Sequence, residues 1–467
     1  MRYRYLLPSS PFPPVLLPLP SSFKEKTGLP LVPYFSASKL AWCLDNIPGL
    51  RADAEAGLAL AGTIDSFLIW RLTRDANSSS SSSSSDKKSS GGLHVTDVSN
   101  ASRTMLLNIH TLKWDAELCA AFRVPLRMLP SVVPSSGAVG KGAQFSPLPG
   151  VPIAGILGDQ QAALFGQACF SPGDAKNTYG TGCFLLLNAG FNVPNPPTDS
   201  GLLTTIAYQR AGHPVVYALE GSVAVAGAAV SWLRDALKII ESPQEMEALA
   251  ASVPDAGGSV LVPAFNGLFA PHWRSDARGA WVGLSAGVGR AHLARATLEA
   301  VAHQSRELLT SMERALGADA PRGALRVDGG MTANALLMQL QADYTGRRCV
   351  RPVVVETTAL GAAYAAGLAT GFWKDEAQLR AQWREDRSWV PQAKPEDVIK
   401  SCRDWDRALA RTLYWQGGGA DQALTLLPKA QNDLARKQLI SLVGAFCTGA
   451  LIATLGWIGM SQHLRRK

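Results

Sequence analysis

The chain has 467 residues, of which 47% are hydrophobic and 18% charged, which is typical of a globular protein with two or more domains. Its formal net charge of +8 is mild for this length and the basic residues are scattered, which argues against a nucleic-acid-binding protein. The seven cysteines form no C-x-x-C pair, so we expect neither a zinc site nor a disulfide framework.

Two segments have the composition of unstructured chain. Residues 1–27 form a predicted disordered leader, because prolines at 8, 11, 13, 14, 18 and 20 prevent a helix there; an organelle-targeting role is the alternative. Residues 77–92 include eight consecutive serines and are predicted to be a surface loop insertion, since they cannot bury enough apolar surface to become ordered.

Helices are expected on both sides of this loop. The patterns predict helices over 38–46, 63–71 and 114–123. The first two carry Trp42 and Trp70, which we expect in the core rather than in a site.

The stretch from 151 to 187 combines two features that carry chemistry. A predicted buried strand, 151–157, ends next to Asp159-Gln160, and a helix is expected over 162–167. A hairpin follows, with 177–182 at its tip, where glycines let backbone N–H groups approach an anion. The stretch therefore offers a candidate general base and a candidate phosphate cradle; the alternative is a buried Asp that caps a helix and an ordinary glycine turn.

Downstream of this stretch, predicted strands alternate with predicted helices, which indicates an α/β architecture. Strands are expected over 215–219, 260–263, 325–327 and 349–355, and helices over 223–240, 290–316, 333–344 and 359–367. In the long helix, Val301, Leu308, Met312 and Leu316 fall on one face. A ligand is expected beyond the carboxyl ends of the strands, where Asp159, Gly330 and Asn334 lie.

The C-terminal region contains an apolar segment. Residues 439–460 carry no charge over 22 residues, which is long enough to cross a bilayer, and basic residues flank them. The sequence predicts a linker over 421–438 followed by a transmembrane tail anchor; the alternative is a buried C-terminal helix.

Several long motifs carry a resemblance to a known family. They are GDQQAALFG, AKNTYGTGCF, YALEGSV, AGAAVSWLRD, VPAFNGLFAPHW, RVDGGMTAN and TALGAAYAAGLATGFW. With these motifs the chain resembles the FGGY carbohydrate kinases, and among them those that phosphorylate glycerol. The resemblance implies the actin-like, RNase H-like ATPase fold, with residues 28–168 and 169–420 as two domains and the active site in the cleft between them.

The resemblance also implies roles for single residues. Asp159 would be the general base and would lie at the metal, and Gln160 and Tyr34 would contact glycerol. Thr181, with the backbone of Gly180 and Gly182, would hold the phosphates of ATP. The remaining implied nucleotide contacts, with ATP and Mg²⁺ as cofactors, are Gly227, Val230, Ser231, Gly330 and Asn334.

The sequence departs from the family pattern in several places. Val32 stands where the family usually has Asp, and Ser231 where it has Gln. The D-x-G-T-T-S hairpin, the Arg-Glu pair and the Trp that open the family's chains are absent, as is the Gly-Arg of a regulatory sugar-bisphosphate loop, so we expect an N-terminally truncated first domain.

The alternatives to a glycerol kinase are a catalytically impaired remnant that binds nucleotide or a membrane, and a kinase for another polyol or sugar. The expected location is the cytoplasmic face of a membrane, in particular the mitochondrial outer membrane, and otherwise the cytoplasm; a homo-oligomer is an open possibility.

Overall fold

The computed structural model describes residues 23–74, 92–144, 146–196, 200–317 and 320–416. Nearly all of the predicted Ser-rich loop, the whole predicted linker and the apolar segment 439–460 lie outside these residues. Within the described residues, no helix combines the length and the apolar character needed to cross a membrane. The described residues up to Thr412 belong to one compact unit, and Leu413 begins a second.

The predicted leader overlaps the first helix of the fold. Residues 23–27 form α1 (Phe23–Thr27), which buries Phe23 and Thr27 against neighbouring helices. Residues 23–27 are therefore helical and not a disordered leader, and residues 1–22 of the predicted leader lie outside the described residues.

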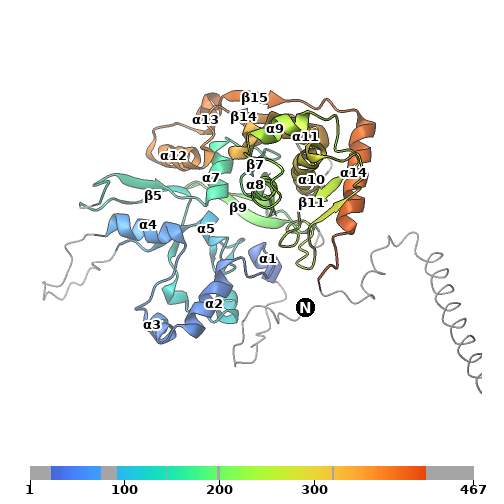
Figure 1. Cartoon of the computed structure of the whole chain (residues 1–467). Coiled ribbons are helices and arrows are strands. Elements are labelled where there is room, and N and C mark those ends of the chain that lie inside the picture. Colours follow the sequence, from blue (N-terminus) through green and yellow to red (C-terminus); the bar gives the residue numbers. More distant parts are fainter. Residues whose placement is uncertain (1–22, 75–91, 145, 197–199, 318–319, 417–467) are drawn as a thin grey trace, which may run out of the picture. The chain divides into compact units, whose positions relative to one another are not determined.

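A seven-stranded mixed sheet forms the centre of the first unit (Figure 1). Its strand order is β15-β14-β13-β7-β8-β10-β9, in which β14, β13 and β7 run parallel and the other neighbours antiparallel. The strands are β7 (Ala175–Tyr179), β8 (Cys183–Gly190), β9 (Leu203–Gln209), β10 (Val215–Val223), β13 (Leu325–Asp328), β14 (Cys349–Pro352) and β15 (Glu385–Trp389). This mixed sheet, with helices between its parallel strands, confirms the predicted α/β class.

Helices cover both faces of this sheet. On one face, α10 (Arg290–Leu316) and α11 (Ala335–Thr345) pack side by side over an apolar core that includes Leu185 and Leu187 (Figure 1). On the other face, α7 (Asp159–Gly166) and α12 (Thr357–Thr370) pack over Leu186 and its neighbours. Successive residues of a strand point to opposite faces, so β8 supplies both cores.

The other helices lie before, between and after these four. They are α2 (Ser36–Asn46), α3 (Leu50–Ala56), α4 (Ile64–Thr73), α5 (Val98–Ala101), α6 (Ala116–Ala121), α8 (Gly227–Asp235), α9 (Glu245–Ala251), α13 (Glu376–Gln382) and α14 (Pro395–Ala410), with 3₁₀ turns at η1 (Leu126–Met128) and η3 (Gly330–Ala333).

Small sheets complete the architecture. The pair β1 (Val95–Asp97) and β4 (Ser131–Val133) is parallel. The antiparallel pairs are β2 (Leu107–Asn108) with β3 (Lys113–Trp114), β5 (Ser136–Lys141) with β6 (Pro152–Gly155), and β11 (Val260–Val262) with β12 (Ala280–Val282).

Several sequence-based expectations need correction. The strands predicted over 151–157 and 349–355 are only β6 and β14. The helix predicted over 114–123 is only α6, because Trp114 pairs with Leu107 in a short sheet. The helix predicted over 223–240 is only α8, because β10 continues to Val223, where it pairs with Cys183. Trp42 is 48% exposed, not buried, because α2 buries Ala37 and Leu44 on its other side.

The long-helix prediction is confirmed in full. It matches α10 at both ends, Arg290 and Leu316. Val301, Leu308 and Met312 are fully buried in the core against the sheet, and Leu316 packs against that core from the side. The regular spacing of apolar residues over 27 positions was a strong enough signal to fix this element.

Candidate active site

The predicted carboxylate–amide pair lies at the first turn of α7. The helix begins at Asp159, and the backbone N–H of the preceding Gly158 donates to Ser99 Oγ at 2.9 Å. Asp159 is exposed, and its Oδ1 accepts a hydrogen bond from the backbone N–H of Gln160 at 2.8 Å. The alternative of a buried, capping aspartate is therefore wrong, and the carboxylate is accessible to a ligand.

Close contact with α12 fixes the position of α7. A Cβ atom on Gly361 would lie 1.8 Å from Ala162 O, and one on Gly166 would lie 2.0 Å from Thr357 O. Only glycine fits at these two points, so the backbones of the two helices touch. Thr358 Oγ1 also donates to Asp159 O at 3.4 Å, which ties the start of α7 to the start of α12.

A buried lysine on the central strand reaches this pair. Lys176 of β7 is fully buried, and its Nζ donates to Gln160 Oε1 and, at 2.9 Å, to Thr178 Oγ1. Phe184, which pairs with Thr178 across the hairpin, is half-buried. The sequence analysis missed Lys176, although a lysine inside an otherwise uncharged strand segment was a signal that could have pointed to it.

A second buried charge lies on the neighbouring strand. Asp328 Oδ2, at the end of β13, accepts hydrogen bonds from Gln167 Nε2 and Thr357 Oγ1, each at 2.8 Å. Gln167 Oε1 in turn accepts from Trp383 Nε1 at 3.2 Å. Asp328 thus joins the end of β13 to the end of α7 and the start of α12.

The predicted hairpin is present, but its tip is 180–182 and not 177–182, because 177–179 belong to β7. Its glycine turn is hydrogen-bonded to the start of α8. Residues 180–182 connect β7 to β8. Thr181 O accepts hydrogen bonds from Ala226 N at 2.9 Å and Ala228 N at 3.0 Å, and Gly180 O accepts one from Gly227 N at 3.0 Å. A Cβ on Gly227 would lie 2.6 Å from Gly180 O, so the structure brings these two predicted segments into direct contact.

The glycine turn also has unused backbone donors. Thr181 is exposed, and within the described part of the chain no oxygen accepts a hydrogen bond from the N–H groups of Thr181 or Gly182. Free N–H groups at a glycine turn form a concave donor site that suits a phosphate group. These N–H groups are therefore available to donate hydrogen bonds to an anion.

A third glycine segment, Gly329-Gly330, lies beside the second, which is Gly227 at the start of α8. Gly330 opens η3, and a Cβ there would meet no atom within 4 Å, so its surroundings are open. The sulfur of the next residue, Met331, lies 3.4 Å from where a Cβ on Gly227 would be. Asn334 caps α11 by accepting from Leu337 N at 2.8 Å, which uses only the oxygen of its side-chain amide.

The two remaining nucleotide-side candidates differ in exposure. Val230 is buried in the core, so its side chain cannot face a ligand, whereas Ser231, on the same helix, is half-buried. Contact through Val230 would therefore have to involve its backbone.

Tyr34 lies on a turn before α2 and is 52% exposed. Its ring stands edge-on to Phe35, and the guanidinium of Arg103 lies over the Phe35 ring. Arg103 Nη1 is 2.5 Å from Oε2 of the buried Glu220 on β10. Among the described residues, no hydrogen bond or ring contact joins Tyr34 to Asp159 or Gln160, so the structure does not bring these three predicted contacts together directly.

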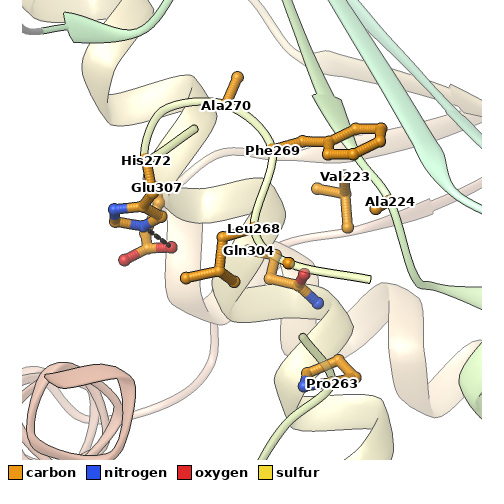
Figure 2. Close-up of a pocket in the computed structure, with 10 residues that line it drawn as sticks. Val223, Ala224, Pro263, Leu268, Phe269, Ala270, His272, Gln304 and Glu307 are labelled. Carbon is orange, nitrogen blue, oxygen red and sulfur yellow. Dashed lines mark hydrogen bonds and ion pairs between the residues drawn. The ribbon is translucent and has the colours of Figure 1, made fainter. Parts of the chain in front are cut away.

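A small pocket lies behind the strand that leads into the α8 turn. Figure 2 shows Val223, Ala224, Phe269 and Gln304 among its lining residues, with His272 and Glu307 facing each other 3.3 Å apart. Its volume of about 10 Å³ is enough for no more than one water molecule. Gln304 Nε2 donates to Val225 O at 3.3 Å, so these residues support the turn rather than bind a substrate.

Metal-binding capacity within the described residues is limited. No group of three or more His, Cys, Asp or Glu side chains could hold a metal ion there. Asp159 is thus a single exposed carboxylate, which suits Mg²⁺ only where other ligands, such as phosphate oxygens and water, complete the coordination shell.

Comparison with known proteins assigns the family. Residues 19–166 match the N-terminal domain of the FGGY family of carbohydrate kinases, and residues 175–370 match the C-terminal domain. The chain belongs to the FGGY family of carbohydrate kinases. The predicted family is therefore confirmed.

Curated relatives in this family are named glycerol kinase. The protein from Methylorubrum extorquens (strain PA1) is 55% identical over 394 residues, which span 84% of this chain and 75% of the relative. The protein from Chloroflexus aurantiacus (strain ATCC 29364 / DSM 637 / Y-400-fl) is 53% identical over 393 residues, with the same coverage.

Solved structures of FGGY relatives share the fold. Plasmodium falciparum glycerol kinase with ADP superposes with a TM-score of 0.75 at 36% identity, over 84% of this chain and 74% of that one. Ligand-bound xylulose kinase from Lactobacillus acidophilus superposes with a TM-score of 0.69 at 20% identity, over 83% and 73% of the two chains. The chain therefore has the sugar kinase, actin-like ATPase fold, as the FGGY resemblance implied.

Proposed function

We propose that this FGGY chain is a glycerol kinase, which transfers the γ-phosphoryl group of ATP to a primary hydroxyl of glycerol and yields sn-glycerol 3-phosphate. The observation that carries the proposal is the exposed Asp159 carboxylate beside Gln160 at the start of a fixed helix, in a chain 55% identical to a curated glycerol kinase. Fold alone would not select glycerol among the polyols and sugars.

The proposed chemistry needs a base and a hydrogen-bonding partner for the polyol. Asp159 takes the proton of the attacking hydroxyl while that oxygen bonds to the γ-phosphorus and ADP leaves. Gln160 and Tyr34 bind the polyol hydroxyls. The exposure of the Asp159 carboxylate supports this role, because a base must be within reach of the proton that it removes.

The nucleotide side is assigned to the glycine segments. Thr181, with the backbone of Gly180 and Gly182, binds phosphate oxygens through the free donors of the turn. The other proposed nucleotide contacts are Gly227, Val230 through its backbone, Ser231, Gly330 and Asn334. The close contact between the 180–182 turn and Gly227 supports this grouping.

Mg²⁺ fits this donor set only together with ATP. Asp159 is the carboxylate that would face the ion, and phosphate oxygens would supply the ligands that the protein does not. When bound, the ion neutralises charge on the phosphates.

Substitution of the base tests the proposal. Asp159→Asn should lower glycerol-dependent ADP release by about 10²- to 10⁴-fold, while calorimetric ADP binding stays near that of the unaltered chain. Asp404→Asn, which alters a partly exposed carboxylate on α14, is the matched control and should keep normal turnover. Near-normal turnover of Asp159→Asn would remove Asp159 from this role. ADP binding without any glycerol-dependent turnover in the unaltered chain would favour the alternative, a nucleotide-binding protein without kinase activity.

The organisation of the chain around this activity is also a proposal. We assign residues 28–168 and 169–420 to the two FGGY domains with the substrates between them, and residues 439–460 to a membrane anchor that leaves the kinase on the cytoplasmic side, in particular at the mitochondrial outer membrane. The uncharged 22-residue stretch supports the anchor. Leu451→Arg should release the protein from membranes; extraction of the unaltered chain by alkaline carbonate would argue against the anchor.

A further inference from the structure

Lys176 is an unusual residue for the centre of a sheet. It lies on β7, the middle strand of seven, and has no exposed surface. No carboxylate of the described residues lies within 4 Å of its ammonium group, so it is not part of a close ion pair. Burying a lysine without a direct counter-ion costs free energy, and the hydrogen bonds of its ammonium group must offset that cost.

Its hydrogen bonds fix the orientation of a neighbouring amide. An ammonium group can only donate, so Gln160 must accept through Oε1. The two ends of a glutamine amide are otherwise hard to distinguish, and here the donor decides between them. The –NH₂ end of Gln160 is left to donate elsewhere, on the residue adjacent to Asp159.

We infer that Lys176 is a positioning residue that holds the Gln160 side chain with its Nε2 group directed at a hydroxyl oxygen of the polyol. This inference rests on the proposed function of the same site and deepens it. It gives Gln160 a defined polarity, because the substrate atom that it contacts must accept a hydrogen bond. A substrate that offers only a donor at that position would be rejected.

The pKa of Lys176 is lowered overall, because the effect of its burial exceeds that of the nearby carboxylates. Burial lowers the pKa of Lys176, while the charges of Asp328, Glu220 and Asp159 raise it. These carboxylates come from β13, β10 and α7, so they surround the ammonium group from three elements. Thr178 supplies a further hydrogen bond at 2.9 Å.

A purely structural role makes a different prediction from a positioning role. If Lys176 only fills space in the sheet, its loss should weaken glycerol and nucleotide binding alike and should lower stability. If it acts through Gln160, the effect should fall on glycerol and should vanish once Gln160 is gone. A double-mutant cycle separates the two cases.

The kinetic experiment uses the full chain with Lys176→Met, Gln160→Ala and the double variant. Lys176→Met keeps an unbranched side chain of nearly the same length and should raise KM for glycerol about tenfold, with KM for ATP unchanged within about twofold. In the Gln160→Ala background, the same change should raise KM for glycerol no further. Additive effects, or an equal rise in both KM values, would overturn the inference. Lys400→Met, at an exposed position of α14, is the control and should leave both values unchanged.

A second measurement tests the contact without depending on turnover. In the chain labelled with ¹⁵N-glutamine, the side-chain amide signals that disappear in Gln160→Ala belong to Gln160. Lys176→Met should shift these signals in the absence of substrate, and Lys400→Met should not. Unmoved signals would overturn the inference even in an active enzyme. A shift in a chain that shows no turnover would locate the failure in the proposed function and not in the contact.

Discussion

The two faces of the seven-stranded sheet differ in how much buried charge they carry. The face toward α10 is covered mainly by apolar residues, such as Leu185, Leu187 and Leu308. The face toward α7 and α12 holds the buried Lys176 and Asp328, each bonded to neutral side chains, and the buried Glu220, which pairs with Arg103. Both faces bury apolar residues, and the face toward α7 and α12 also positions the proposed catalytic residues.

Strand β7 contains both faces within five residues. Ala175 and Tyr179 point to the apolar core, and Lys176 and Thr178 point to α7. A strand buried on both sides shows no polar–apolar alternation that would mark a surface. A polar residue in such a strand therefore signals a buried network, and in this protein that network leads to the site.

The largest expected effect is on the apolar face. Leu308→Ala removes a fully buried side chain that lies against the backbone of Gly221, and should lower the free energy of unfolding by about 3 to 4 kcal/mol. Leu284→Ala, at a side chain that is 59% exposed, should change it by less than about 0.5 kcal/mol. Chemical denaturation measures both. A loss below about 1 kcal/mol for Leu308→Ala would contradict this expectation and would mean that the core on the α10 face tolerates repacking.

A somewhat smaller effect is expected on the charged face. Asp328→Ala leaves the buried donors of Gln167 and Thr357 without an acceptor and should cost about 2 to 3 kcal/mol of unfolding free energy. Asp328→Asn keeps an acceptor oxygen and should cost about 1 kcal/mol. Equal losses for the two variants would show that the charge of Asp328, and not its hydrogen bonds, stabilises this face.

The smallest effect concerns a ring on the α10 side. His303 of α10 is stacked between Tyr344 and Trp405, and its Nε2 is 2.8 Å from Ser401 Oγ. Burial, with a smaller contribution from the charge of Arg306, holds the pKa of His303 well below its ordinary value. The ring is therefore neutral in the folded protein, whereas the unfolded chain takes up a proton near pH 6.5.

The sign of the pH effect follows from this difference. Below about pH 6.5 the unfolded state binds more protons, so stability should fall as the pH decreases, by at most about 1.4 kcal/mol per pH unit for this one group. His303→Phe keeps a ring in the stack but cannot be protonated, so its stability should fall less between pH 7 and pH 5. Parallel stability curves for the two proteins would show that His303 is not responsible.

The sequence was most informative where a signal was local and long. The spacing of Val301, Leu308 and Met312 fixed α10 at both ends, and the glycines at 180 and 182 located the hairpin turn. The strand that ends at Val223 and the exposure of Trp42 were missed, because pairing with Cys183 and the choice of the buried side of α2 are decided by distant residues.

The candidate site was predictable only in part, for a similar reason. Asp159, Gln160 and Thr181 came from motifs that are contiguous in the sequence, and the structure shows the carboxylate exposed and the glycine segments in contact. The contact of Lys176 with Gln160 spans two elements, and the motif AKNTYGTG says nothing about which face of the strand carries the lysine. The side-chain burial of Val230 likewise depends on how α8 packs.

The first turn of α12 connects two parts of the proposed site that belong to different substrates. Thr357 bonds to Asp328, next to the glycines on the nucleotide side, and the following residue, Thr358, bonds to the backbone of Asp159. A displacement of α12 would thus move the carboxylate and the end of β13 together. Reaction rates are sensitive to misplacements of about 1 Å between reacting groups. The position of α12 therefore affects both the polyol side and the nucleotide side of the proposed site. We expect substitutions in this helix to slow phosphoryl transfer even where the changed residue contacts neither substrate.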